Sequence, residues 1–338
     1  MQGTFTEIIN SSWEWTRAVL FRPFRLKKWL LLCIIALMAA EFSGCNMNFN
    51  LPGKKARQEI VEPGEGILPA AGASEQAGKL LWALPFIIAA GAVALAFFLL
   101  LLWLYSRFTF IFLRAVARND VSIKIPFQEN RFVGNSFFKW NISVFIAVGG
   151  LIMIMVLLLM AGVFLLQDAA IVVKALCAAL WGLMLFFIIL ALILVNIIAR
   201  DLVLPVMYKE KMGVMGGWRQ VLNIVSSDKV GFIKYVLLKA LLRIGAGIIA
   251  VVISVVVLLM LLIPLGILAG LLFSVSLLMP LAVKVFYYIF LAGLAVLALF
   301  ILLFIMNIVL LPIPVFFRTF SLKFLARMDE RYNLFQLG

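Results

Sequence analysis

Histidine is absent from this chain of 338 residues, and charged residues make up only 13% of it. The missing imidazole removes the side chain that most often acts as general acid, general base or metal ligand. The three cysteines, Cys33, Cys45 and Cys177, are an odd number and lack the spacing of a metal or redox site. We therefore expect no disulfide framework, no metal and no cofactor, and we predict that the protein is not an enzyme.

Apolar residues dominate the rest of the composition. They form 66% of the chain and the mean hydropathy is +1.18, whereas a soluble domain is about 25% charged. Residues 80–105 contain no charged side chain, and as a helix at about 1.5 Å per residue this stretch can cross a hydrocarbon core of roughly 30 Å. These features predict an all-α, multi-pass transmembrane helical bundle that forms a single membrane domain over residues 1–338.

We predict about six spans, arranged as three hairpins. Residues 244–283 carry no charge and would extend for about 60 Å as one helix, which is twice the membrane thickness. Either a span ends near Pro264 and a short re-entrant or interfacial helix follows, or this stretch crosses twice. The predicted spans are residues 29–45, 80–105, 141–166, 175–199, one crossing within 244–283, and a last crossing within 285–317.

The first predicted span, residues 29–45, contains Glu41 and Ser43 near its far end. A signal sequence is the alternative, since Phe42-Ser-Gly-Cys45 is close to a lipoprotein processing site with Cys45 as the lipidated residue. The basic region before it begins late for a signal, and Glu41 is poorly placed for one. Residues 29–45 are therefore taken as a span.

The basic residues predict the orientation. If residues 244–284 cross the membrane once, 23 of the 29 Lys and Arg residues lie on the same side of the membrane as the N-terminus. That side then carries all of the net charge of +14. Cytoplasmic loops carry such an excess. We predict an inner-membrane protein with both termini in the cytoplasm, whereas a second crossing here would move the basic tail outside.

The connecting segments follow from this topology. Residues 1–28 are predicted to form an interfacial amphipathic helix and a basic anchor, and an amphipathic helix packed on protein is an equal alternative. Residues 218–238 have a similar amphipathic pattern and are predicted to be a second interfacial helix. Residues 46–78, rich in Gly, Pro and Glu, are predicted to be an extracytoplasmic loop, and residues 318–338 a cytoplasmic tail.

No ionisable side chain lies within a predicted span away from its ends. Asn196 and Asn307 are the candidate polar intramembrane residues, and we expect their amides to bond backbone or neighbouring helices rather than to line a substrate path. Gly266, Gly270 and Ser274 recur at four-residue spacing, which predicts close helix packing.

Several motifs together resemble an uncharacterised prokaryotic family of roughly six-span membrane proteins, known as a domain of unknown function. The resemblance covers nearly the whole chain and implies an integral inner-membrane protein, without established catalytic residues. A looser similarity is to the membrane domain of some glycerophosphodiester phosphodiesterases, whose catalytic domain this chain lacks. The motifs are residues 20–29, Ser106-Arg-Phe108, Asp201 with Pro205-Val-Met-Tyr208, Phe232-Ile-Lys-Tyr235 and Pro314-Val-Phe-Phe-Arg318.

These observations leave three classes of function. The first choice is a non-enzymatic membrane component that acts through helix packing, lipid or partner contacts. The alternative is a transporter or channel subunit for a small or lipid-like substrate, and a membrane enzyme comes last. The expected partners are the lipid bilayer, including anionic lipids at the basic face, and proteins that the sequence does not identify. Nucleic acid is not expected, because the charge is spread over juxtamembrane segments.

Overall fold

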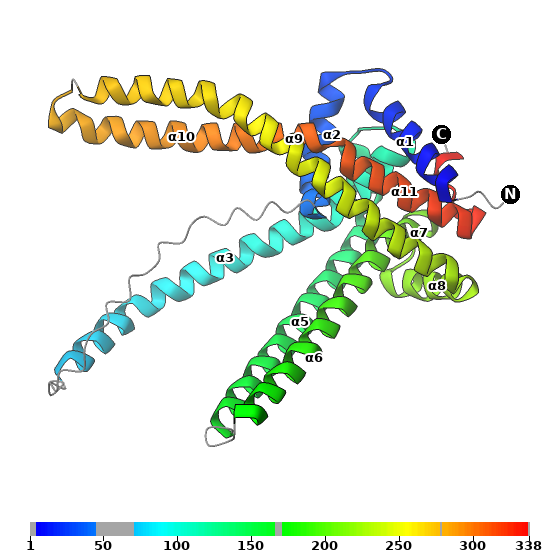
Figure 1. Cartoon of the computed structure of the whole chain (residues 1–338), viewed down its shortest axis with the longest axis horizontal. Coiled ribbons are helices and arrows are strands. Elements are labelled where there is room, and N and C mark those ends of the chain that lie inside the picture. Colours follow the sequence, from blue (N-terminus) through cyan, green and yellow to red (C-terminus); the bar gives the residue numbers. More distant parts are fainter. Residues whose placement is uncertain (1–4, 45–70, 166–170, 278, 337–338) are drawn as a thin grey trace.

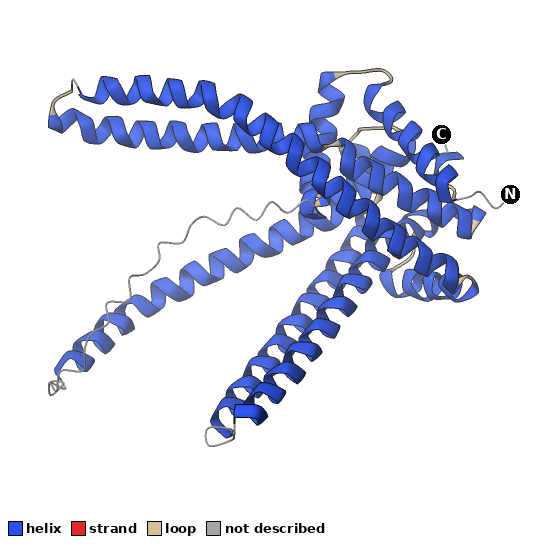
Figure 2. Cartoon of the chain, viewed as in Figure 1, coloured by secondary structure: helices blue, strands red, loops and turns tan. Residues whose placement is uncertain are grey.

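The computed structural model describes residues 5–44, 71–165, 171–277 and 279–336. Every regular element within these residues is a helix (Figure 2), which confirms the all-α prediction. Three long arms spread from a compact region that contains both ends of the described chain (Figure 1). We call this region the hub. It consists of α1 (Phe5–Phe21), α2 (Leu26–Met38), residues 107–118 of α3, α4 (Lys124–Glu129), α7 (Leu204–Glu210), α8 (Val214–Ser227), α11 (Pro312–Met328) and the adjoining ends of α5 and α9.

Among the described residues, five helices are long and apolar enough to cross a membrane, and these helices build the arms. The single arm is α3 (Ala71–Arg118). The other two arms are α5 (Arg131–Leu165) with α6 (Ile171–Ile198), and α9 (Lys229–Leu277) with α10 (Leu281–Leu310). Two of the three predicted hairpins therefore exist, and the third arm is one helix.

The arm helices bury little of their apolar surface within this chain. In each of the five, only 0 to 11% of the most apolar 18-residue window is buried. Contacts between arm helices include the rings of Phe98 on α3 and Phe145 on α5, whose centroids are 5.1 Å apart, and the bond from the Tyr287 hydroxyl of α10 to the Leu272 carbonyl of α9 at 2.7 Å. A helix that is apolar on all sides needs an apolar surrounding, which the described part of the chain does not provide.

The hydrophobic core lies in the hub instead. Tyr235 of α9 is fully buried between two rings of α11, with its centroid 5.6 Å from that of Phe320 and 4.0 Å from that of Phe324. A second cluster joins one face of α2 to residues 111–116 of α3 and to the start of α11. These contacts fix the positions from which the arms leave.

The N-terminal helix α1 packs on protein. The rings of Phe5 and Phe324 stack with centroids 6.4 Å apart, and Trp13 contacts Phe316 edge-on at the same distance. The indole of Trp15 donates to the Val116 carbonyl at 2.8 Å. These contacts fit the alternative of an amphipathic helix packed on protein, and the interfacial position of residues 1–28 on the membrane stays a prediction.

The prediction of a first span over residues 29–45 is wrong for the described residues. Helix α2 has 13 residues and is about 20 Å long, short of the roughly 30 Å that a span needs. The chain turns at Ala40, whose φ is 48°, and Glu41 then joins an ion cluster in the hub. Helix α2 therefore ends at Met38, shortly before the charge that interrupts the apolar run. Cys45 lies outside the described residues.

Residues 244–277 form a single continuous helix. Pro264 lies inside α9, which ends at Leu277, and α10 begins after a short turn. The stretch therefore does not fold back near Pro264, and no second crossing occurs within the described part of it.

Gly266 and Gly270 do not lie at a close contact with another described part of this chain. A Cβ atom built on either glycine meets nothing within 4 Å, and the Ser274 hydroxyl donates to the Gly270 carbonyl of its own helix at 2.9 Å. Close packing at these three residues is therefore not found within the described part of the chain, because α9 extends into an arm at this point. Close packing occurs at Gly217 of α8, where an added Cβ would lie 2.9 Å from Met207 Cγ.

The Gly217→Leu change should therefore destabilise the hub. Its side chain would overlap Met207 and Val203, which are fully buried, and overpacking of this kind costs about 1–3 kcal/mol. We expect a lower melting temperature and yield in detergent. The matched change Gly266→Leu should leave both at the wild-type level, and equal losses in the two variants would contradict this description of the core.

Candidate functional site: a cationic cavity at the base of the arms

The candidate site lies where the arms join the hub. One turn of π-helix, η2 (Ala199–Val203), connects α6 to α7. Pro205 follows in the first turn of α7, and because proline has no N–H it cannot donate to the Asp201 carbonyl one turn earlier. Such π turns are often found at functional sites. Here the turn places Arg200 and Asp201 beside α9 and α11.

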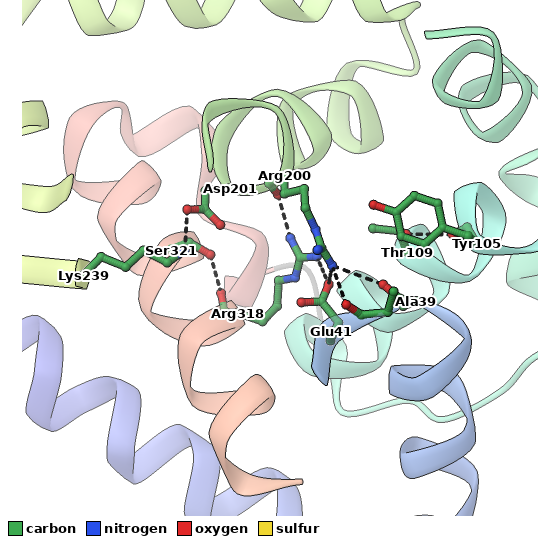
Figure 3. Close-up of polar contacts among 10 residues, drawn as sticks. Ala39, Glu41, Tyr105, Thr109, Arg200, Asp201, Lys239, Arg318 and Ser321 are labelled. Atoms are coloured by element: carbon green, nitrogen blue, oxygen red, sulfur yellow. Dashed lines mark hydrogen bonds and ion pairs between the residues drawn. The ribbon is translucent and has the colours of Figure 1, made fainter. Parts of the chain in front are cut away.

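Arg200 and Arg318 converge on the carboxylate of Glu41 (Figure 3). Arg200 Nη2 lies 3.2 Å from Glu41 Oε1, and Arg318 Nη2 donates to the same oxygen. Arg318 Nη1 also donates to the Arg200 carbonyl at 2.7 Å, and Arg200 Nη2 donates to the Ala39 carbonyl at 3.1 Å. One carboxylate therefore joins the segment after α2, the turn η2 and helix α11.

Asp201 forms a second buried pair beside the first. Lys239 of α9 forms an ion pair with Asp201 Oδ2, and the Tyr235 hydroxyl donates to the same oxygen at 2.9 Å. The side chains of Lys239 and Asp201 are only 3% and 9% exposed. Buried charges at this depth need partners, since an unpaired one would cost several kcal/mol.

The charged residues of the two clusters, together with Arg243, line a cavity of about 100 Å³, which is large enough for several water molecules or one small anion. Its ionisable lining comprises four cations against two carboxylates, an excess of two positive charges. The cavity is therefore suited to an anion. The ionisable residues are Glu41, Arg200, Asp201, Lys239, Arg243 and Arg318.

Glu41 is anionic at neutral pH. Burial alone would raise the pKa of this carboxyl, but Arg200 and Arg318 together outweigh the effect of burial and hold the pKa below its ordinary value. In the described part of the chain, no group of three or more His, Cys, Asp and Glu side chains could hold a metal ion.

The two predicted asparagines lie apart. Asn196 of α6 lines the cavity. The amide of Asn307 on α10 donates to the Leu303 carbonyl of its own helix at 2.7 Å, and Asn307 does not line this cavity. The structure does not bring the two residues into one site.

Patterns in the sequence did not predict the ion cluster. In the sequence, Glu41 interrupts a predicted span, and Asp201, Tyr235 and Arg318 belong to the family motifs. The available signal was Lys239, a single charge within the apolar stretch of residues 236–242. A charge on an apolar helix face generally needs a buried partner.

A family model described as a family of unknown function (DUF7544) matches residues 5–335. No curated protein and no solved structure matches the chain. The looser similarity to the membrane domain of glycerophosphodiester phosphodiesterases is therefore not supported.

The pH dependence of stability tests the role of Glu41. A carboxyl with a lowered pKa contributes stability above its ordinary pKa, and this contribution is lost as the pH falls below about 4.5. Glu41→Gln should lower the free energy of unfolding at pH 7 by about 3 kcal/mol. Because the variant lacks this titrating group, the difference from wild type should shrink in acid.

The control variant is Glu129→Gln. Glu129 pairs with Arg114 at 2.5 Å, but its side chain is 51% exposed, so the loss should be below about 1 kcal/mol. Thermal unfolding in detergent between pH 3.5 and 7 provides the measurement. A Glu41→Gln loss that is small, or that stays constant with pH, would show that the cluster does not stabilise the hub.

Proposed function

We propose that this chain, which belongs to a family of unknown function (DUF7544), is a non-enzymatic membrane component that acts through lipid and partner contacts. The observation that carries the proposal is the exposed apolar surface of the arms, of which so little is buried within the chain. Lipid satisfies such helices directly, because their backbone groups are already bonded within each helix.

The basic hub supports a cytoplasmic location. Both ends of the described chain lie in it (Figure 1), and the segments that form it contain most of the Lys and Arg residues of the chain. Basic juxtamembrane segments favour the cytoplasmic side and attract anionic lipids. We therefore place the hub at the cytoplasmic face of the cell membrane, with both termini inside.

The number of crossings constrains this topology. Five helices that each cross once would leave the two chain ends on opposite sides of the membrane, whereas both described ends lie in the hub. A location of both termini inside therefore requires one further passage outside these five helices. Cys45 lies between α2 and α3 in the sequence and can report on this passage.

No specific observation favours the transporter alternative. Asn196 and Asn307 do not share a cavity, and the cationic cavity is at the base of the arms rather than along them. The following experiment would nevertheless detect an aqueous path between the arms.

Single-cysteine variants of a chain without its native cysteines test the proposal. Four residues are changed to cysteine, one in each variant. Arg219 lies on the hub surface and Lys284 lies near the far end of α10, whereas Ile154 and Ile263 are exposed residues within the arms. With a membrane-impermeant thiol reagent, the Lys284 variant should react in intact cells and the Arg219 variant only after permeabilisation. The two arm variants should stay unreactive because lipid covers them.

Each outcome has a distinct meaning. Reaction of both arm variants with the water-soluble reagent would contradict lipid coverage and favour a transporter. Labelling of the Arg219 variant in intact cells would reverse the orientation. A variant that retains only Cys45 should react only after permeabilisation, because Glu41, four residues earlier, lies in the ion cluster of the hub. Reaction of this variant in intact cells would contradict the placement of the hub at the cytoplasmic face.

A further inference from the structure

We propose that the cationic cavity and an adjoining apolar groove form one binding site for a single anionic phospholipid. This inference rests on the proposed function, because it takes the arms to be embedded in lipid. The cavity would hold the phosphate of the headgroup, and the groove would hold one acyl chain.

The groove and the cavity share a wall. The groove lies between α9 on one side and the end of α10 with the start of α11 on the other, and Trp13 of α1 contributes to its lining. Phe317 lines both spaces, and the Arg243 guanidinium lies 5.7 Å from the centroid of its ring. A ligand with a charged end and an apolar end can therefore occupy both.

The dimensions of the groove fit an acyl chain. Its volume is about 520 Å³, and along α9 it extends from Leu241 to Ile253. Twelve residue steps of about 1.5 Å give roughly 18 Å, close to the 15 Å half-thickness of a hydrocarbon core. Apart from the indole N–H of Trp13, the lining side chains are apolar.

The charge of the cavity selects the other end of the ligand. Glu41 and Asp201 compensate only part of the positive charge of the four cations, and Arg243 on the exposed surface of α9 stands where the cavity approaches the groove. Arg318 Nε is buried and has no hydrogen-bond partner in the described structure. A phosphate oxygen is the acceptor that such donors bind best, and basic pockets between transmembrane helices bind anionic headgroups.

Lipid binding in detergent tests the site. The purified full-length chain should gain thermal stability, with saturation, from added phosphatidic acid. Phosphatidylcholine with the same acyl chains tests the need for net negative charge, and inorganic phosphate tests the need for the acyl chain. We expect neither of these two to stabilise the protein at the same concentrations.

Two pairs of variants locate the site. Arg243→Gln removes a cation from the cavity and should weaken phosphatidic acid binding about tenfold, whereas Lys234→Gln removes an exposed cation of the same helix that does not line the cavity. Gly245→Leu fills the groove and should weaken binding similarly. Gly247→Leu, two residues away and outside the groove lining, should not. An added Cβ meets nothing within 4 Å at either glycine, so both variants should fold.

Stabilisation by phosphatidylcholine equal to that by phosphatidic acid would overturn the proposal, and so would stabilisation by phosphate alone. Equal binding by the Arg243 and Lys234 variants, or by the two glycine variants, would also contradict it. These failures can be told apart from failure of the proposed function, which would appear as water-accessible cysteines in the arms.

Discussion

Charge buried at the base of the arms is the constraint on which this structure depends. Glu41, Arg200 and Arg318 come from segments far apart in the sequence, and the contact between Glu41 and Arg318 spans 277 positions. Asp201 and Lys239 add the start of α9. Asp201, Lys239 and Arg318 are buried, and the side chains of Glu41 and Arg200 are only 13% and 18% exposed, so lack of a partner would be costly for these charges. The need for partners therefore holds four parts of the chain together where the arms leave the hub.

The association of the arm helices depends on a different interaction. Between helices in lipid there is no hydrophobic driving force comparable to that in water, so association needs close packing or polar contacts. Gly266 and Gly270 offer small surfaces, yet open space surrounds them within the described chain. The contrast with Gly217, where a Cβ would not fit, separates a hub stabilised by its own packing from arms that rely on their surroundings.

The arm helices could be predicted well from the sequence, because a long stretch without charged residues indicates a membrane-crossing helix by its composition alone. It failed at α2, where the same apolar character is buried on hub helices instead of in lipid. Length was the clue, since the apolar run stops at Glu41. The ion cluster could not be predicted, because pairing between Glu41 and Arg318 depends on how distant helices meet. Asn196 and Asn307 are both polar residues in apolar stretches, so the sequence does not distinguish them. In the structure, Asn196 lines the cavity, whereas the amide of Asn307 bonds its own helix.

A double-mutant cycle on Asp201 and Lys239 tests most directly whether buried charge pairing holds the hub together. Asp201→Asn and Lys239→Gln each leave one buried charge without its partner and should each cost about 3–5 kcal/mol of unfolding free energy in detergent. The double variant removes both charges, so its loss should be smaller than the sum of the single losses by at least about 2 kcal/mol. Additive losses would contradict the account.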